Sequence, residues 1–350
     1  MKILLRADAS AKTGAGHMGR CIALAQELGA RGNLVEFATR TDDRLGTSML
    51  TRAEIPFRIL DCNDDWRSDA KATREAAQAS DWVVVDHYGL DDRWETQIRK
   101  SGSKILVIDD LANRRHDCDI LVDAGRAPGS DAYRDLLPPA SAVLLGPRYS
   151  ILRREFRTRR RRASRTRKKN ILVFFGSADG SGLTMPVLEA LDGVGCRASL
   201  NVHVVVTDAN PRRRQIRQLE GVIVHENVPN MAALLSGMDM AIGAAGLSMW
   251  ERCRLGVPSL TIALNDNQRP GLEIAASAGA VVPLELEDAR SSPILYETVS
   301  AFVANRNALV AAGSAARRLV DGLGARRVAQ AIGAPALSPE RCVAPSGRPA

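Results

Sequence analysis

The first 28 residues, MKILLRADASAKTGAGHMGRCIALAQEL, predict a β-strand, a glycine-containing loop and an amphipathic helix in that order. The strand is expected at residues 3–5 and the loop at residues 8–16, and the helix begins near His17. Apolar side chains then recur every three or four positions, so one face of the helix can pack on a sheet: Met18, Cys21, Ala25 and Leu28. A strand that leads into such a helix is the opening unit of an α/β fold.

Short apolar runs alternate with helix-like segments along the chain, which is the pattern of parallel α/β sheets. The runs WVVVD (82–86) and KILVIDD (104–110) are continuously apolar and end in Asp. Buried central strands have this composition, and their carboxyl ends form the edge that carries ligands. In the first half we expect strands at residues 3–5, 35–38, 57–60, 82–85, 105–108, 120–122 and 143–145, and helices at 69–79 and 91–100.

The same pattern restarts at residue 170 with NILVFFGSADG. Further strands are expected in NVHVVV, VIVH, MAIGAAG and SLTIAL, and helices at residues 184–191, 231–236, 248–254 and 268–278. We therefore predict two Rossmann-like α/β domains, residues 1–152 and 170–334, whose parallel sheets face a central cleft. A ligand that spans such a cleft is held by the carboxyl ends of both sets of strands.

An arginine-rich segment, residues 153–169, joins the two predicted domains. It holds eleven Arg or Lys and one Glu, a net charge of +10, so the rest of the chain carries −2 of the total of +8. Because the basic charge is confined to one segment, we interpret the segment as a solvated linker, and the sequence argues against nucleic-acid binding by a folded surface. The alternative is a polyanion-binding protein acting through this segment. The Pro-rich tail, 335–350, is predicted to be disordered.

The composition limits the class of protein. Charged residues make up 25% and apolar residues 45%, as in soluble globular proteins, and no apolar run reaches the roughly 18 residues of a membrane-spanning helix. Arg6 and Asp8 interrupt the first apolar run, so we expect no signal peptide and a cytoplasmic location. The cysteines form no C-x-x-C pair, so we expect free thiols, no metal and no cofactor: Cys21, Cys62, Cys118, Cys196, Cys253 and Cys342.

His17 is the first candidate for a functional residue. Gly14 and Gly16 allow the backbone to approach a ligand closely, and the first amides of the helix can bind an anion. The loop lacks both the G-K-[ST] of a P-loop and the glycine spacing of a dinucleotide site. We therefore expect His17 beside a bound phosphate or a reacting sugar. One alternative is that His17 is only a polar residue at the start of the helix. Another is that His87, and not His17, acts as the catalytic base.

The segment MAIGAAGLSMWE (240–251) predicts a strand, a glycine turn at Gly246 and a helix from about Ser248. The amino end of that helix can hold a diphosphate. Glu251 lies about one turn into the helix, and its acceptor-only carboxylate suits ribose hydroxyl groups. The alternative for Glu251 is that it complements the positive end of the helix.

Three other strand ends carry polar candidates. Asn267 and Gln268 can hold sugar hydroxyl or acetamido groups, although helix capping explains them equally well. Tyr88 follows a buried strand and can hydrogen-bond a substrate or orient a water. Gly176 and Ser177 follow the first strand of the second half and can line the phosphate side of the cleft.

Taken together, GAGHMGR, VVDHYGLD, FFGSADG, GAAGLSMWE and NDNQ resemble the UDP-sugar hydrolases of pseudaminic acid biosynthesis. The substrate of that family is UDP-2,4-diacetamido-2,4,6-trideoxy-β-L-altropyranose. The resemblance runs from residue 1 to about residue 330. It implies a GT-B-like fold, related to that of the transferase that adds N-acetylglucosamine to lipid-linked muramyl-pentapeptide.

The resemblance also implies roles for individual residues. His17 would be the general base, Tyr88 and Asn267 would contact substrate or water, and the UDP site would contain Gly246, Ser248 and Glu251. The implied reaction is metal-independent hydrolysis at the anomeric carbon, with inversion and release of UDP. The alternative is a GT-B glycosyltransferase that uses an alcohol acceptor in place of water. The sequence determines neither the hexose nor the oligomeric state, for which we expect a monomer.

Overall fold

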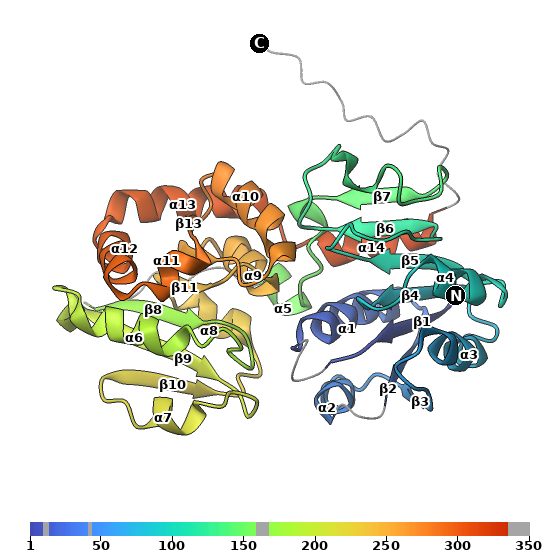
Figure 1. Ribbon diagram of the computed structural model, residues 1–350, viewed down its shortest axis with the longest axis horizontal. Coiled ribbons are helices and arrows are strands. Elements are labelled where there is room, and N and C mark those ends of the chain that lie inside the picture. The colour runs from blue at the N-terminus through green and yellow to red at the C-terminus, as the bar shows by residue number, and fades with distance from the viewer. Residues whose placement is uncertain (10–13, 41–43, 159–167, 335–350) are drawn as a thin grey trace, which may run out of the picture.

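The computed structural model describes residues 1–9, 14–40, 44–158 and 168–334. These residues form two α/β domains that lie side by side, each built on a sheet whose described strand pairs are all parallel (Figure 1). This arrangement confirms the predicted fold class. Within the described ranges, no helix has the length and apolar character needed to cross a lipid bilayer.

The N-terminal sheet has seven strands in the order β3-β2-β1-β4-β5-β6-β7. All seven strands that the sequence predicts in this half are present. Their bounds are Lys2–Ala7, Leu34–Arg40, Phe57–Leu60, Trp82–Asp86, Lys104–Ile108, Ile120–Asp123 and Ala142–Leu145 for β1 to β7. The helices are α1 (Gly16–Gly29), α2 (Arg44–Arg52), α3 (Trp66–Ala76), α4 (Asp92–Arg99) and the 3₁₀ turns η1 (Asp131–Tyr133) and η2 (Pro147–Tyr149).

The C-terminal sheet has six strands in the order β10-β9-β8-β11-β12-β13. The strands are β8 (Lys169–Phe174), β9 (Leu200–Val206), β10 (Val222–Glu226), β11 (Met240–Ala244), β12 (Ser259–Ile262) and β13 (Val282–Leu284). The sequence does not predict β13, a three-residue edge strand that contains Pro283. The helical elements are α6 (Thr184–Gly193), η3 (Arg197–Ser199), α7 (Arg213–Arg217), α8 (Met231–Ser236), α9 (Leu247–Leu255), η4 (Asp266–Gln268), α10 (Arg269–Ser277), α11 (Leu286–Arg290), α12 (Ser292–Ala304) and α13 (Arg306–Leu319).

In both sheets the strand order reverses once, between β1 and β4 and between β8 and β11. Loops on either side of such a reversal diverge and leave a crevice at the carboxyl ends of the strands, where ligands bind. The loop from β1 to α1 and the end of β4 lie at the first reversal, and the turn from β11 to α9 lies at the second. These are the segments in which the sequence places most of the candidate site residues.

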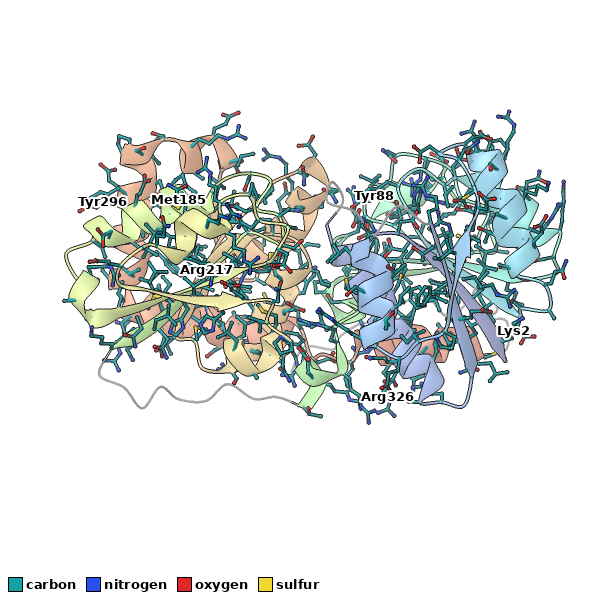
Figure 2. All side chains as sticks on the ribbon, turned by 90° about the horizontal axis from the view of Figure 1, so that it is seen from below. Lys2, Tyr88, Met185, Arg217, Tyr296 and Arg326 are labelled. Carbon is teal, nitrogen blue, oxygen red and sulfur yellow. The ribbon has the colours of Figure 1, made fainter. Side chains whose placement is uncertain are left out.

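The last helix, α14 (Gly324–Gly333), packs on the N-terminal domain, whereas the predicted second domain extends to residue 334. Val328 and Ile332 are buried in the same core as β1 and α1. Figure 1 shows α14 beside β5 and β6, and Figure 2 places Arg326 on the same domain as Lys2. A Cβ atom on Gly324 would lie 2.1 Å from the carbonyl oxygen of Ser150, so glycine permits this close approach.

The arginine-rich segment is only partly a linker. Residues 154–158 form helix α5 (Arg154–Thr158), in which the Phe156 side chain is fully buried and Arg157 pairs with Glu27 of α1. Residues 159–167 and the tail 335–350 lie outside the described residues. The predicted solvated linker therefore begins later than residue 153, because Phe156 anchors its first part.

Candidate active site

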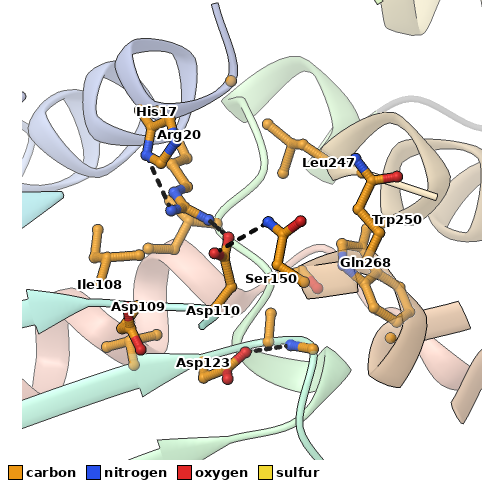
Figure 3. Close-up of a pocket in the computed structure, with 18 of the residues that line it drawn as sticks. His17, Arg20, Ile108, Asp109, Asp110, Asp123, Ser150, Leu247, Trp250 and Gln268 are labelled. Atoms are coloured by element: carbon orange, nitrogen blue, oxygen red, sulfur yellow. Dashed lines mark hydrogen bonds and ion pairs between the residues drawn. The ribbon is translucent and has the colours of Figure 1, made fainter. Parts of the chain in front are cut away.

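A cleft between the two domains is lined by residues from both (Figure 3). The cleft is open to solvent, and the space between its lining residues amounts to about 910 Å³. The N-terminal wall contains the start of α1 and the carboxyl ends of β4, β5 and β6. The C-terminal wall contains the turn after β11, the start of α9, η4 and α10. Six predicted site residues line this cleft: Gly16, His17, Tyr88, Gly246, Asn267 and Gln268.

His17 is held by a carboxylate at the end of a neighbouring strand. It is the second residue of α1, it is 8% exposed, and its Nδ1 atom lies 2.5 Å from Oδ1 of Asp86. Because the carboxylate accepts the Nδ1 proton, the neutral imidazole keeps its lone pair on Nε2. Asp86 stands opposite Ala7 in the β1–β4 register, so the strand order brings it under the helix start.

Asp86 stays ionised although its side chain is fully buried. Arg20, one turn along α1 from His17, donates from Nε to Oδ2 at 2.5 Å and from Nη2 to Oδ1 at 2.7 Å. Burial by itself raises the pKa of the Asp86 carboxyl, but the Arg20 charge and the hydrogen bonds from Arg20 and His17 outweigh it and hold that pKa well below its usual range. Arg20 also donates to Asp110 at 3.1 Å, as Figure 3 shows. The sequence by itself predicts no role for Asp86 or Arg20, although the H-x-x-R spacing is a usable signal for Arg20.

Tyr88 and Asn267 meet across the cleft. The Asn267 Nδ2 atom donates to the Tyr88 hydroxyl at 3.0 Å and to Asp110 Oδ1 at 3.3 Å. The Tyr88 ring also stands edge-on to the His17 ring, with centroids 4.5 Å apart. Figure 2 shows Tyr88 on the side of its domain that faces the other. Burial raises the pKa of Tyr88, so its hydroxyl is neutral near pH 7 and can both donate and accept.

The glycine loops of the two domains approach each other beside this cleft. Gly14 has φ +75°, and a Cβ atom placed on it would lie 4.0 Å from the Ser177 hydroxyl. Gly176 has φ +94°, and the Ser177 carbonyl accepts a hydrogen bond from Thr207 at 2.8 Å. Gly14, Gly176 and Ser177 therefore border the interdomain space without lining the pocket itself.

Ser248 and Glu251 lie further along α9 and do not line the pocket. The Ser248 hydroxyl accepts from Arg252 at 3.2 Å. Glu251 is 5% exposed, and its Oε1 atom accepts from Arg153 at 3.1 Å. Burial raises the pKa of Glu251, and Arg153 partly opposes that shift. The roles assigned to Ser248 and Glu251 in binding UDP stay predictions.

His87, the rival candidate for the base, is not among the residues that line the pocket. Its Nδ1 atom accepts from the Gly89 amide at 3.0 Å, and its Nε2 atom lies 3.6 Å from Asp8. Burial lowers the pKa of His87 to about 4, and the nearby Arg6 charge acts in the same direction. These contacts indicate that His87 positions its loop.

Replacing His87 by Asn tests this distinction. The Asn side-chain oxygen can take the place of Nδ1 as acceptor for the Gly89 amide, so we expect a folded protein. The rate of UDP release should stay within about tenfold of the unsubstituted protein, since loss of a true general base costs roughly 10²–10⁴-fold. A loss of that larger size in a variant with an unchanged thermal midpoint would show that His87 takes part in the chemistry.

Among the described residues, no group of three or more His, Cys, Asp or Glu side chains is arranged to hold a metal ion. The described cysteines are free thiols: Cys21, Cys62, Cys118, Cys196 and Cys253. Cys342 lies in the tail, outside the described residues.

No protein-family profile matches the chain. An uncharacterized protein of Methanocaldococcus jannaschii is 28% identical over 286 residues, which are 77% of this chain and 57% of that protein. The UDP-2,4-diacetamido-2,4,6-trideoxy-beta-L-altropyranose hydrolase of Campylobacter jejuni is 25% identical over 240 residues, which are 66% of this chain and 81% of the hydrolase. The spore coat polysaccharide biosynthesis protein SpsG of Bacillus subtilis is 32% identical over 190 residues, which are 52% of this chain and 56% of SpsG. The chain thus spans little more than half the length of two of these relatives.

Solved glycosyltransferase structures share the fold along nearly the whole chain. MurG of Acinetobacter baumannii superposes with a TM-score of 0.66 at 17% sequence identity. The superposition covers 95% of this chain and 99% of the MurG chain. Anabaena Alr3699/HepE, solved in complex with UDP and glucose, gives a TM-score of 0.64 at 11% identity, with 95% and 99% covered. The two parallel-sheet domains and the cleft between them define a GT-B fold. The chain is a GT-B protein that is distantly homologous to a UDP-sugar hydrolase and to SpsG.

Proposed function

We propose that the protein hydrolyses a UDP-linked diacetamido-trideoxyhexose, UDP-2,4-diacetamido-2,4,6-trideoxy-β-L-altropyranose, as a step in pseudaminic acid biosynthesis. The observation that carries the proposal is the His17–Asp86 pair at a cleft lined by both domains. Homology to the Campylobacter jejuni hydrolase supports the substrate class. Tyr88 and Asn267, which meet beside His17, support a site that is assembled from both domains.

In the proposed reaction, Nε2 of His17 takes a proton from a water molecule as the water oxygen attacks the anomeric carbon. The bond between that carbon and the β-phosphate oxygen breaks on the opposite face, and its electron pair leaves with UDP. The products are UDP and a free hexose of inverted anomeric configuration. His17 then loses its proton to solvent. Asp86 fixes the tautomer of His17 and stabilises the imidazolium that forms.

The proposed UDP site lies on the C-terminal domain. Gly246 precedes the first turn of α9, whose free amides favour the charge that builds on the leaving diphosphate. Gly176 and Ser177 would border the phosphates, and Gln268 and Asn267 the hexose. In this proposal, the ribose hydroxyls replace Arg153 as the partner of Glu251.

The test is UDP release from the UDP-sugar by the full-length protein with no acceptor present. We expect stoichiometric release of UDP and free hexose, and NMR spectra taken early in the reaction should show the inverted anomer before it equilibrates. A strict glycosyltransferase, the alternative that the MurG-like fold raises, would release little UDP until an alcohol acceptor is added.

A further inference from the structure

The wall of the cleft formed by the ends of β5 and β6 carries carboxylates that the proposed hydrolysis does not use. Asp109 and Asp110 follow β5, and Asp123 ends β6. All three line the cleft. Asp110 is already engaged, since it accepts from Arg20 and from Asn267. The partners of Asp109 and Asp123 determine which of these two groups is available to a ligand.

Asp109 has a full set of partners within its own loop. Its Oδ2 atom accepts from the amides of Leu111 at 3.2 Å and Ala112 at 2.8 Å, and its Oδ1 atom accepts from Arg114 at 2.7 Å. The carboxylate is fully buried, and the Arg114 charge compensates it. Asp109 therefore holds the loop after β5 in place.

Asp123 has fewer donors than a buried carboxylate requires. Its side chain is 1% exposed, and its Oδ1 atom accepts from the Gly125 amide at 2.7 Å, as Figure 3 shows. The Tyr133 hydroxyl lies 2.9 Å from Asp123 Oδ2 and also 2.9 Å from Asp109 Oδ2. One hydroxyl has a single proton, so it serves only one of the two carboxylates at a time. Arg126 Nε, at 3.6 Å, is beyond hydrogen-bond distance.

The protonation equilibrium of Asp123 reflects this deficit. Burial raises the pKa of its carboxyl to about 6, and the charges of Asp110 and Asp109 act in the same direction. Asp86, buried beneath His17, is the contrasting case, because Arg20 and His17 hold its pKa low.

Ser150, which follows η2, lines the same cleft. It is 1% exposed, and its hydroxyl has no hydrogen-bond partner among the described residues. Buried polar groups in folded proteins are nearly always paired, so the Ser150 hydroxyl is available to a hydrogen-bonding group that binds beside it.

The opposite wall is close at this point. A Cβ atom on Gly271 would lie 3.5 Å from the Gly125 Cα atom and 3.1 Å from the Trp250 ring. The two glycines thus let the domains approach within van der Waals distance beside Asp123. Trp250 and Asp123 line the same cleft from the two domains.

We propose that Asp123 and Ser150 determine specificity by reading one amide substituent of the hexose. Asp123 accepts a hydrogen bond from the amide N–H, and Ser150 donates one to the amide carbonyl. A carboxylate at the same position on the sugar is rejected by the Asp123 charge. The inference rests on the proposed function for the placement of the hexose, but it assigns a role to residues that the hydrolysis itself does not require.

The test replaces Asp123 by Asn. The Asn oxygen can keep the Gly125 amide, and its NH₂ group can donate to Tyr133, which then donates to Asp109, so the fold is expected to be preserved. Affinities for UDP, UDP-glucose, UDP-N-acetylglucosamine and the diacetamido substrate are measured by calorimetry in a His17→Ala background to prevent turnover. We expect affinity for the diacetamido substrate to fall by roughly tenfold to hundredfold, the usual cost of a hydrogen bond to a charged group, with UDP affinity changed less than about twofold.

Ser150→Ala provides the second arm and Asp239→Asn the matched control. We expect Ser150→Ala to weaken the diacetamido substrate by roughly three- to tenfold and to leave UDP-glucose unchanged. Asp239 is another buried Asp next to a strand, where it accepts from the Asn170 amide at 3.0 Å, and Asp239→Asn should change no affinity. If the Asp123→Asn protein does not fold, the affinities of the Ser150→Ala protein for the diacetamido substrate and for UDP-glucose decide whether the inference holds.

Unchanged preference for the diacetamido substrate over UDP-glucose in the folded variants overturns the inference. If that preference is unchanged in the variants and the unsubstituted protein still hydrolyses the substrate, the inference is wrong but the proposed function stands. Absence of hydrolysis, with a preference for the amide sugar that depends on Asp123, overturns the proposed function alone.

Discussion

Replacing His17 by Ala or Phe is expected to abolish UDP release, with a fall in kcat of roughly 10²–10⁴-fold, while the affinity for UDP is nearly unchanged. The reason is geometric: Asp86 engages Nδ1, so Nε2 is the proton acceptor at the cleft, and neither Ala nor Phe offers one. UDP affinity should persist because the proposed UDP site lies on the C-terminal domain. Single-turnover UDP release and UDP calorimetry on the same preparation measure both quantities.

The His87→Asn protein is the control for this experiment, because it removes the imidazole that is next to Tyr88 in the sequence and does not line the pocket. Added imidazole should restore part of the rate to the His17→Ala protein, whose side chain leaves space, and less to the bulkier His17→Phe protein. If His17→Ala retains activity within a few-fold, the assignment of the base is wrong.

The sheets could be predicted from the sequence because each strand carries its own signal. WVVV and ILVFF are apolar along their whole length, as strands that are covered on both faces must be, and β4 and β8 begin and end within a residue or two of them. The position of α14 could not be predicted in this way. Its apolar face fits either domain, and the chain folds it onto the N-terminal core, where Gly324 lies against Ser150.

Site residues could be predicted from the sequence where a single loop after a strand identifies them. His17, Tyr88 and Asn267 each follow a strand end, and the structure brings them together. The contact between Asp86 and Arg20 could not be predicted, because it requires β1 and β4 to be neighbours in the sheet. The order of the strands along the chain does not reveal that they are neighbours. The same holds for Glu251, whose observed partner comes from a segment about a hundred residues earlier.

Replacing Asp86 by Asn should lower kcat by roughly 10²–10⁴-fold with little change in KM, because the Asn amide would donate toward His17 Nδ1 and favour the tautomer whose proton is on Nε2. Arg20 would lose one of its two carboxylate partners but keep Asp110. We expect a loss of stability of up to about 3–5 kcal/mol, the range for an opened buried ion pair, measured by urea unfolding.

Arg20→Lys separates the positioning role of Asp86 from its structural role. Lysine keeps a positive charge beside Asp86 but cannot contact both of its oxygens. The substitution also removes Arg20 Nη2, which lies 3.2 Å from His17 Nδ1, but it leaves the contact from Asp86 to His17 in place. Stability should therefore fall in both variants, but the large fall in kcat should appear only in Asp86→Asn. Equal losses of kcat in the two variants, in proportion to their losses of stability, would mean that Asp86 only holds the helix start and does not set the tautomer of His17.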